Sequence, residues 1–290
     1  MSIDDEHSLP RRQRKRVAQG LGVSLQIVDA YWAAGRLLVG RPGWPAPRVV
    51  PLETLVFDDD VVWFDGAPIG PGAPTVCAVL NKTAGVTCTA HDPKGRGDLA
   101  PFLRALPPGC FAVGRLDRDT TGLLLFTNDG DLANAVLRPD HRIDKLYVLH
   151  VDGLVTADDP RLAQLVGSIT DRGELLTARS VSILEANDAG TRLALTLTEG
   201  KNRQVRRMCA AVGLRLVHLH RHRVGPLTDD GLAPGDLRML EPAEVETLWE
   251  ALGGRAELRQ RRVDGLARQA HEAREAGTPD VRLERWLDHG

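Results

Sequence analysis

The stretch that decides the fold is residues 114–122, Gly-Arg-Leu-Asp-Arg-Asp-Thr-Thr-Gly, which continues into residues 123–130, Leu-Leu-Leu-Phe-Thr-Asn-Asp-Gly. A shorter apolar run, Phe-Ala-Val, precedes it at residues 111–113. Short apolar runs bounded by glycine are typical of buried strands. The pattern therefore predicts two core strands joined by a polar loop, and a loop held at both ends presents its side chains rigidly.

The loop carries both signs of charge, with Arg115 and Asp117 two positions apart. On an extended backbone these two side chains point to the same face. A guanidinium group beside a carboxylate favours the ionised form of that carboxylate. The spacing therefore predicts a carboxylate that is ready to act as a nucleophile.

Two known loop types share part of this spacing. Asp117-x-Asp119-x-Thr121 imitates the start of a calcium-binding EF-hand loop, but Asn128 takes the place of the final glutamate, which argues against calcium. The two aspartates also imitate the aspartyl-phosphate loop of haloacid-dehalogenase-like phosphatases. That loop should follow an unbroken apolar strand, and Gly114 interrupts the strand here. A magnesium-dependent phosphatase stays as an alternative.

The complete string of residues 114–130 closely resembles the catalytic motif of the RsuA/RluB-type ribosomal pseudouridine synthases. The resemblance implies that Asp117 is the catalytic aspartate. Residues 145–149 resemble the Lys-x-Tyr-x-Val stretch of the same family, which implies that Tyr147 lies against the target base, although its strand position also suits a core residue. Residues 199–208 resemble the third family motif, which implies Arg206 as the partner of Asp117, with Arg203 as the second candidate.

Positive charge is unevenly placed along the chain, although the formal net charge is −2. Residues 11–16 form one basic cluster, and residues 201–223 form a second stretch without acids. Such local stripes favour binding to a phosphate backbone, whereas solvated faces are the plainer alternative. The residues expected to contact RNA are Arg14, Arg16, Lys94, Arg96, Arg115, Lys201, Arg203, Arg207, Arg221 and Arg223.

The length of 290 residues, 42% of them hydrophobic, predicts two domains with a sizeable core. We expect a disordered N-terminus over residues 1–10, a small domain over 11–70, a catalytic domain over 71–252 and a charged tail over 253–290. The family resemblance implies an α+β fold for the catalytic domain, with a mixed, largely antiparallel sheet.

The small domain is predicted as two helices followed by short strands. Residues 21–24 and 34–39 carry its resemblance to S4-like RNA-binding domains. The Pro-rich residues 41–51 depart from that family, which usually has a short turn there. Two interpretations follow, an RNA-binding module and a capping domain that does not touch RNA.

Neither the cysteines nor the histidines predict a metal site. The four cysteines form no Cys-x-x-Cys pair, and they suit a reducing cytoplasm. His218, His220 and His222 alternate onto one face of a predicted strand, but no acid is expected near them and the surrounding arginines repel a cation. We expect no metal, no cofactor and no membrane segment, and a monomer in the cytoplasm.

The family resemblance implies an enzyme that isomerises one uridine to pseudouridine in ribosomal RNA. The 23S RNA is the first expectation, with 16S RNA or tRNA as other substrates. Three first steps remain as alternatives for Asp117: attack at the sugar C1′, attack at the base, or removal of a sugar proton. A phosphatase built on both aspartates and a non-catalytic RNA-binding module are the competing classes.

Overall fold

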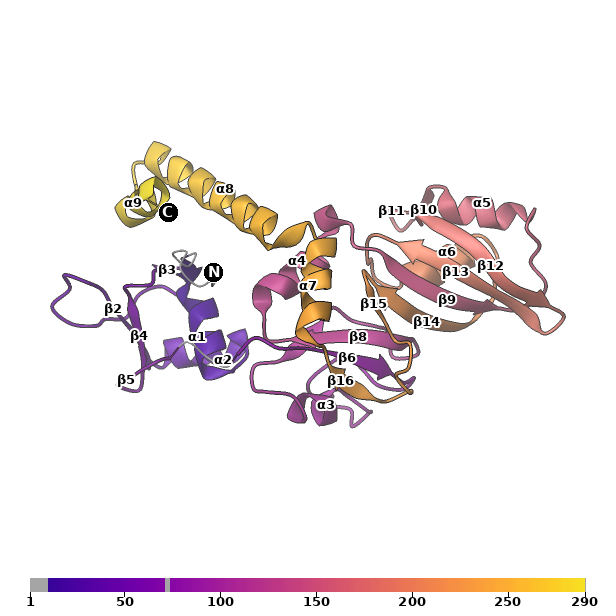
Figure 1. Ribbon diagram of the computed structural model, residues 1–290, viewed down its shortest axis with the longest axis horizontal. Helices are drawn as coiled ribbons and strands as arrows, with labels where there is room; N and C mark the ends of the chain where they lie inside the picture. Colours follow the sequence, from indigo (N-terminus) through magenta and orange to yellow (C-terminus); the bar gives the residue numbers. More distant parts are fainter. Residues whose placement is uncertain (1–9, 71–73, 290) are drawn as a thin grey trace. The chain divides into compact units, whose positions relative to one another are not determined.

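The computed structural model describes residues 10–70 and 74–289, in two compact units. One unit spans residues 75–253, and the other combines residues up to 74 with those from 254 onward. Most of the N-terminus expected to be disordered, residues 1–9, lies outside the described residues. Figure 1 shows the helices and strands of each unit.

The larger unit is built on a nine-stranded sheet. Its main path runs β12-β13-β9-β14-β8-β6-β16, while β7 pairs with β8 and β15 pairs with β14. Every pairing is antiparallel except that of β14 with β8. This confirms the expected mixed, largely antiparallel sheet. The strands are β6 Cys77–Lys82, β7 Phe111–Val113, β8 Thr121–Thr127, β9 Lys145–Val151, β12 Ser180–Asn187, β13 Gly190–Leu197, β14 Leu216–Val224, β15 Leu227–Thr228 and β16 Leu237–Met239.

Strand β8 shows why the deciding stretch is a continuous apolar run. Residues 122–127 are buried, because β6 and β14 flank the strand and the side chains on both of its faces are covered. At its start, Gly122 pairs with Arg221 of β14 and has a φ of +99°. A Cβ atom at this position would lie 2.3 Å from the carbonyl oxygen of Arg221, so the close approach of the two strands requires glycine.

Helices and one small hairpin complete this unit (Figure 1). Helix α6 contacts β14, α5 contacts β12, and apolar residues of α6 join the main core. Asp129 caps α4 by accepting hydrogen bonds from the backbone N–H groups of Asp131 and Leu132. The elements are α3 Ala100–Arg104, α4 Gly130–Leu137, the 3-10 helix Pro139–His141, α5 Pro160–Val166, β10 Ile169–Asp171, β11 Glu174–Leu176, α6 Gln204–Ala211 and α7 Pro242–Ala251.

In the smaller unit a two-residue strand precedes two helices, and short strands follow the helices as expected. Ser24 caps the second helix through the N–H group of Ile27. One core joins Val17 and Val28 of the helices to Leu37 of the first strand after them. The elements are β1 Arg11–Arg12, α1 Gln13–Leu21, α2 Leu25–Ala33, β2 Leu37–Gly40, β3 Leu55–Val56, β4 Val61–Phe64 and β5 Ala67–Pro68.

The charged residues from 254 onward, for which the sequence predicts no definite structure, form α8 Gly254–Glu275 and α9 Val281–His289. They belong to the smaller unit, because Leu266 and Leu283 share an apolar cluster with Leu55 of β3. Arg282 of α9 also pairs with Asp60, at 2.6 Å. In residues 10–70 and 74–289, none of the helices has the length and apolar composition needed to cross a bilayer.

Candidate active site

Asp117 lies in the loop between β7 and β8. The neighbouring Leu116 side chain is buried in the core and anchors the loop. A tight turn follows, in which the N–H group of Thr120 donates to the backbone carbonyl of Asp117 at 3.0 Å. The Asp117 side chain is about one quarter exposed, so its carboxylate is accessible but fixed.

Two arginines from the start of α6 hold this carboxylate. Arg206 Nε lies 3.4 Å from Asp117 Oδ2, and Arg203 Nη1 lies 3.6 Å from the same oxygen. Arg206 also donates through Nη2 to Thr120 Oγ1 at 3.1 Å, which ties α6 to the turn. Its side chain is 19% exposed, against 51% for Arg203. The structure therefore brings both candidate arginines to Asp117, with Arg206 the more enclosed.

Arg203 reaches this position through an unusual backbone conformation. It is the N-cap residue of α6, with φ 50° and ψ 31°, in the left-handed region. This conformation costs a non-glycine residue about 1–2 kcal/mol. Such strain clusters at functional sites, where the surrounding structure maintains it.

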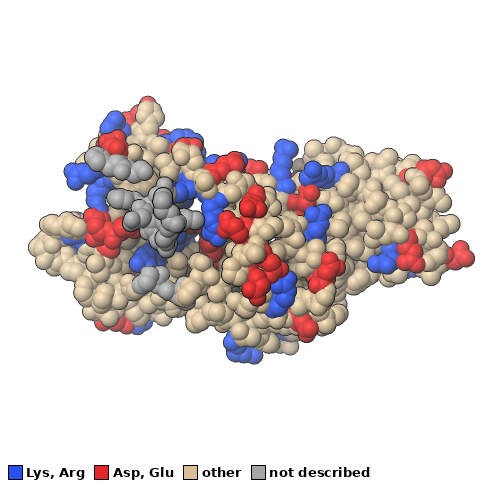
Figure 2. Space-filling view, viewed as in Figure 1, with Lys and Arg blue, Asp and Glu red and all other residues tan. Residues whose placement is uncertain are grey.

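Tyr147 of β9 and Asp117 line the same open cavity. Tyr147 is also packed in the core, and its contact with the target base stays a prediction. Asp117 is the only acid among the described residues that line the cavity. The basic residues that line it are Arg115, Lys145, Lys201, Arg203 and Arg221. On the face shown in Figure 2, by contrast, acidic and basic groups are interspersed.

The interior of the cavity disfavours further positive charge. Burial and, to a lesser extent, the nearby Arg221 lower the pKa of Lys145 to about 8, against a smaller opposing effect of Asp144. Arg221 is itself buried and donates through Nε to the carbonyl of Leu123 at 2.8 Å. An anionic group entering this cavity would relieve the repulsion between these cations.

Comparison with known proteins shows the family to which the chain belongs. Residues 76–211 match the family model of the RNA pseudouridylate synthases. The chain is 36% identical to the ribosomal large subunit pseudouridine synthase B of Bacillus subtilis (strain 168), over 69% of this chain and 82% of that protein. The chain belongs to the RNA pseudouridine synthase family. The expected RsuA/RluB-type membership and the assignment as a pseudouridine synthase, an isomerase, are thereby confirmed.

Other comparisons support the same membership of the synthase family. The chain is 34% identical to the ribosomal small subunit pseudouridine synthase A of Yersinia pestis, over 82% of this chain and 97% of that protein. A crystal structure of a pseudouridylate synthase superposes with a TM-score of 0.55 at 26% identity, over 83% of this chain and all of the other. The α+β fold is therefore that of a pseudouridine synthase.

Lys82 is a residue of this synthase's site that the sequence analysis did not single out. Its side chain is wholly buried, and Nζ donates to the carbonyl oxygens of Thr83 at 2.9 Å and Arg118 at 3.2 Å. Burial lowers the pKa of Lys82, and the nearby Asp119 and Asp117 oppose that effect. Through the Arg118 carbonyl, Lys82 thus fixes the loop that carries Asp117. The one signal for it in the sequence is its place just after the apolar run of residues 76–80.

The basic residues expected to contact RNA divide into several groups. Arg115, Lys201, Arg203 and Arg221 line the cavity, whereas Arg207 does not. The Arg207 guanidinium pairs with Asp171 and Glu174 of the β10–β11 hairpin, and its side chain is only 9% exposed. Arg207 thus already has two carboxylate partners within the chain, and its contact with RNA stays a prediction.

Four of the five remaining predicted RNA contacts have partners within the chain as well. Arg96 pairs with Asp92 and lowers the pKa of that carboxyl to about 2, while Lys94 is exposed beside it. Arg223 donates to the carbonyl of Gly225 at 3.0 Å. In the smaller unit, Arg14 pairs with Asp29, and Arg16 donates to the carbonyl of Gly70 at 3.2 Å. None of these side chains is among the described residues that line the cavity.

One expectation about the histidines is wrong. No acid was expected near the histidines of β14, but Asp229 lies 2.6 Å from His220 and 2.7 Å from His222. The short β14–β15 hairpin folds the chain back and brings Asp229 beside the strand.

Proposed function

We propose that this synthase isomerises a uridine in ribosomal RNA and that Asp117 is its catalytic residue. The observation that carries the proposal is the setting of Asp117, which is the single acid among the described residues of a basic cavity, paired with Arg206 and Arg203 and facing the same space as Tyr147. A carboxylate placed beside two guanidinium groups suits nucleophilic or base chemistry.

The reaction assigns a task to each of the three side chains. The glycosidic bond between N1 and C1′ breaks, the base turns, and a new bond joins C5 to C1′. The C5 proton is then lost, while N1 gains a proton, so that no oxidant or reductant is needed. Asp117 acts on the nucleoside to start the reaction, Arg206 positions Asp117, and Tyr147 stacks on the base and assists loss of the C5 proton.

The basic cavity residues suit an RNA substrate. A base within structured RNA must leave its stack to reach Asp117, at a cost of a few kcal/mol. Contacts of Arg115, Lys201 and Arg203 to phosphates would offset that cost through counterion release. We also propose that residues 11–70, with Arg14 and Arg16, form a second RNA-binding module, because the smaller unit has the S4-like order of elements.

Ribosomal RNA is favoured as the substrate because the names of the two similar synthases specify the ribosomal large and small subunits. We infer 23S RNA as the first choice, from the large-subunit relative at 36% identity, with 16S RNA second and tRNA third. We place the reaction in the cytoplasm, because the four free cysteines suit reducing conditions. We expect the active protein to be a monomer, because one chain supplies Asp117, Arg206 and Tyr147 together.

The competing phosphatase needs both loop aspartates, and only Asp117 is among the described residues that line the cavity. The test is to map pseudouridine in 23S RNA, 16S RNA and tRNA from cells with and without this protein. The proposal predicts one ribosomal uridine that is isomerised only when the protein is present. Identical maps of all three RNA classes would refute it.

A further inference from the structure

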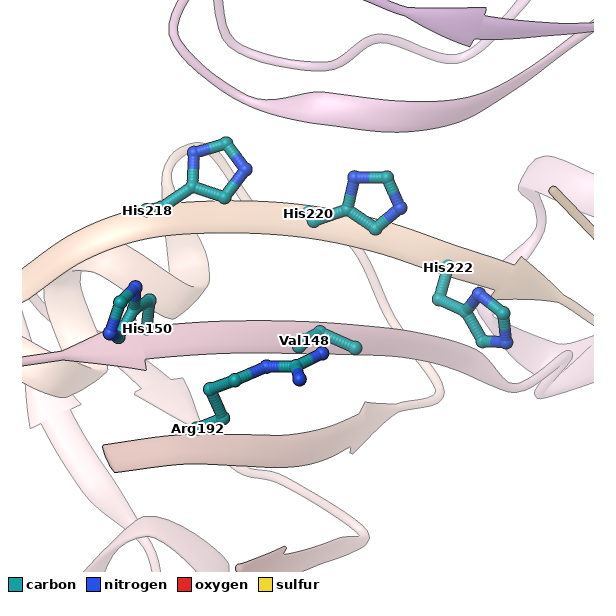
Figure 3. A pocket seen from close by; sticks show the side chains of 6 residues that line it. All are labelled: Val148, His150, Arg192, His218, His220 and His222. Carbon is teal, nitrogen blue, oxygen red and sulfur yellow. The ribbon is translucent and has the colours of Figure 1, made fainter. Parts of the chain in front are cut away.

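A row of imidazoles lies on the face of the sheet opposite Tyr147. Successive residues of a strand point to opposite faces, so Val148 and His150 of β9 face away from Tyr147. His220 and His218 of β14 pair with these two residues in the antiparallel register and share their face. Figure 3 shows His218, His220 and His222 along β14, beside a hollow of about 290 Å³.

A buried carboxylate joins two of these imidazoles. Asp229 Oδ1 lies 2.7 Å from His222 Nδ1, and Oδ2 lies 2.6 Å from His220 Nε2. The Asp229 side chain is only 6% exposed. Despite the short distance, Oδ2 has no hydrogen bond of acceptable geometry. A buried carboxylate oxygen left in this state is costly unless a cation completes its coordination.

The other nitrogen of His220 is held by a hydroxyl group. Thr121 Oγ1 lies 2.8 Å from His220 Nδ1 and 3.0 Å from His218 Nε2. Metal-binding histidines typically use one ring nitrogen for the metal and bond the other to a fixed polar group, which orients the ring. His220 has this arrangement, with Nε2 directed to Asp229.

We propose that His220, His222 and Asp229 bind a Zn²⁺ ion. Two imidazole nitrogens and one carboxylate are a ligand set that zinc accepts, with a fourth position for water. The ligand atoms of the three residues all lie within 4.8 Å of one another. Bonds of about 2.0–2.2 Å to zinc need ligand atoms no more than about 4 Å apart. Zinc binding would therefore require small rotations of the imidazoles, whose side chains are 25% and 30% exposed.

The proposed ion has a structural role. It would link the middle of β14 to the chain just after β15, and through Thr121 to the first residue of β8. It lies on the opposite face of the sheet from Tyr147, so the isomerisation does not pass through it. The arginine of this hollow does not oppose it strongly, because Arg192 pairs with Glu185 at 3.4 Å.

The test uses the full-length protein, stripped with a chelator and titrated with Zn²⁺ by calorimetry. We expect one bound equivalent that is lost in Asp229→Asn and in His222→Gln. His150→Gln is the matched control, because His150 lines the same hollow but lies outside the cluster, and it should bind as the native protein does. Thr121→Val should weaken binding by about 10–100-fold.

Co²⁺ provides a second readout that does not depend on activity. The native protein should give the visible absorption bands of tetrahedral Co²⁺, and Asp229→Asn should not, with circular dichroism confirming that each variant is folded. If Asp229→Asn does not fold, His222→Gln decides. A native protein that binds no Zn²⁺, or folded variants that bind it with unchanged affinity, would overturn the proposal and leave the cluster as a contact between imidazole and carboxylate groups.

Discussion

Replacing Gly122 with alanine tests how the loop of Asp117 is joined to the strand beside Tyr147. Gly122 is the second residue of β8 and pairs with Arg221, which in turn pairs with Tyr147 across β14 and β9. A change at this position therefore acts on both sides of the cavity. No side chain is removed by the substitution, so any effect comes from the backbone.

The magnitude follows from the geometry of the two strands. The new Cβ atom would lie 2.3 Å from the Arg221 carbonyl oxygen, about 0.7 Å inside the 3.0 Å that such contacts keep. Adding a group to a packed site costs about 1–3 kcal/mol, and the positive φ of +99° adds about 1–2 kcal/mol for alanine. We expect a loss of roughly 2–5 kcal/mol in the free energy of unfolding. Displacement of the catalytic groups by about 1 Å should slow isomerisation by about 100-fold.

Urea unfolding and single-turnover isomerisation measure the two effects. The matched control is Gly130→Ala at the start of α4, where the new Cβ atom meets nothing within 4 Å and the φ is not positive. This control should be stabilised by up to about 1 kcal/mol and keep its rate. A Gly122→Ala protein with native stability and rate would refute the reasoning about this junction.

Three further changes test neighbouring features. Arg203→Asn should slow isomerisation. The free energy of unfolding should stay constant or rise by up to about 1 kcal/mol, because asparagine tolerates the left-handed conformation. A clear loss of stability would contradict this. The pKa of Lys145 is lowered from 10.5 to about 8 in the folded chain. Between pH 8 and pH 10.5 the unfolded chain therefore binds a proton that the folded chain has released, so the free energy of unfolding should rise with pH over this range. Urea unfolding should show a smaller rise in Lys145→Met, and an unchanged rise would count against a buried lysine. Lys82→Met leaves the carbonyls of Thr83 and Arg118 without their hydrogen-bond donor, which should lower the free energy of unfolding by about 1–3 kcal/mol for each carbonyl. Removal of the buried charge partly offsets this loss. The variant should also slow isomerisation, and a native rate would show that Lys82 does not position the loop.

The centre of the fold could be predicted because local signals agree there. Glycines bound the apolar runs around residues 114–122, so the strands and their loop followed from the sequence. The motif of residues 199–208 could be placed as well, because the order of the motifs matches the family. The distance between Asp117 and Arg206 could not be predicted in this way, since 86 residues separate the Thr120 contact from Arg206 along the chain.

The missed features depend on pairings that the sequence does not show. The partners of Arg207 are one such feature, because the β10–β11 hairpin supplies Asp171 and Glu174. Asp229 lies seven positions after His222, and only the turn of the β14–β15 hairpin brings it back to the strand. Lys82 was overlooked because lysine is almost never fully buried without a partner, and here the partners are backbone carbonyls.

The central claim is that Asp117 carries the chemistry, and the most direct test compares it with Asp119 in the same loop. Full-length Asp117→Asn and Asp119→Asn proteins are each mixed in excess with ribosomal RNA, and pseudouridine is measured over a single turnover. Asparagine keeps the volume of the side chain and removes its charge, so Asp117→Asn should fold, bind the RNA and form no pseudouridine. Asp119→Asn should keep a rate near that of the native protein, because this exposed residue does not line the cavity. Substantial turnover by Asp117→Asn, or equal loss in both variants, would contradict the account.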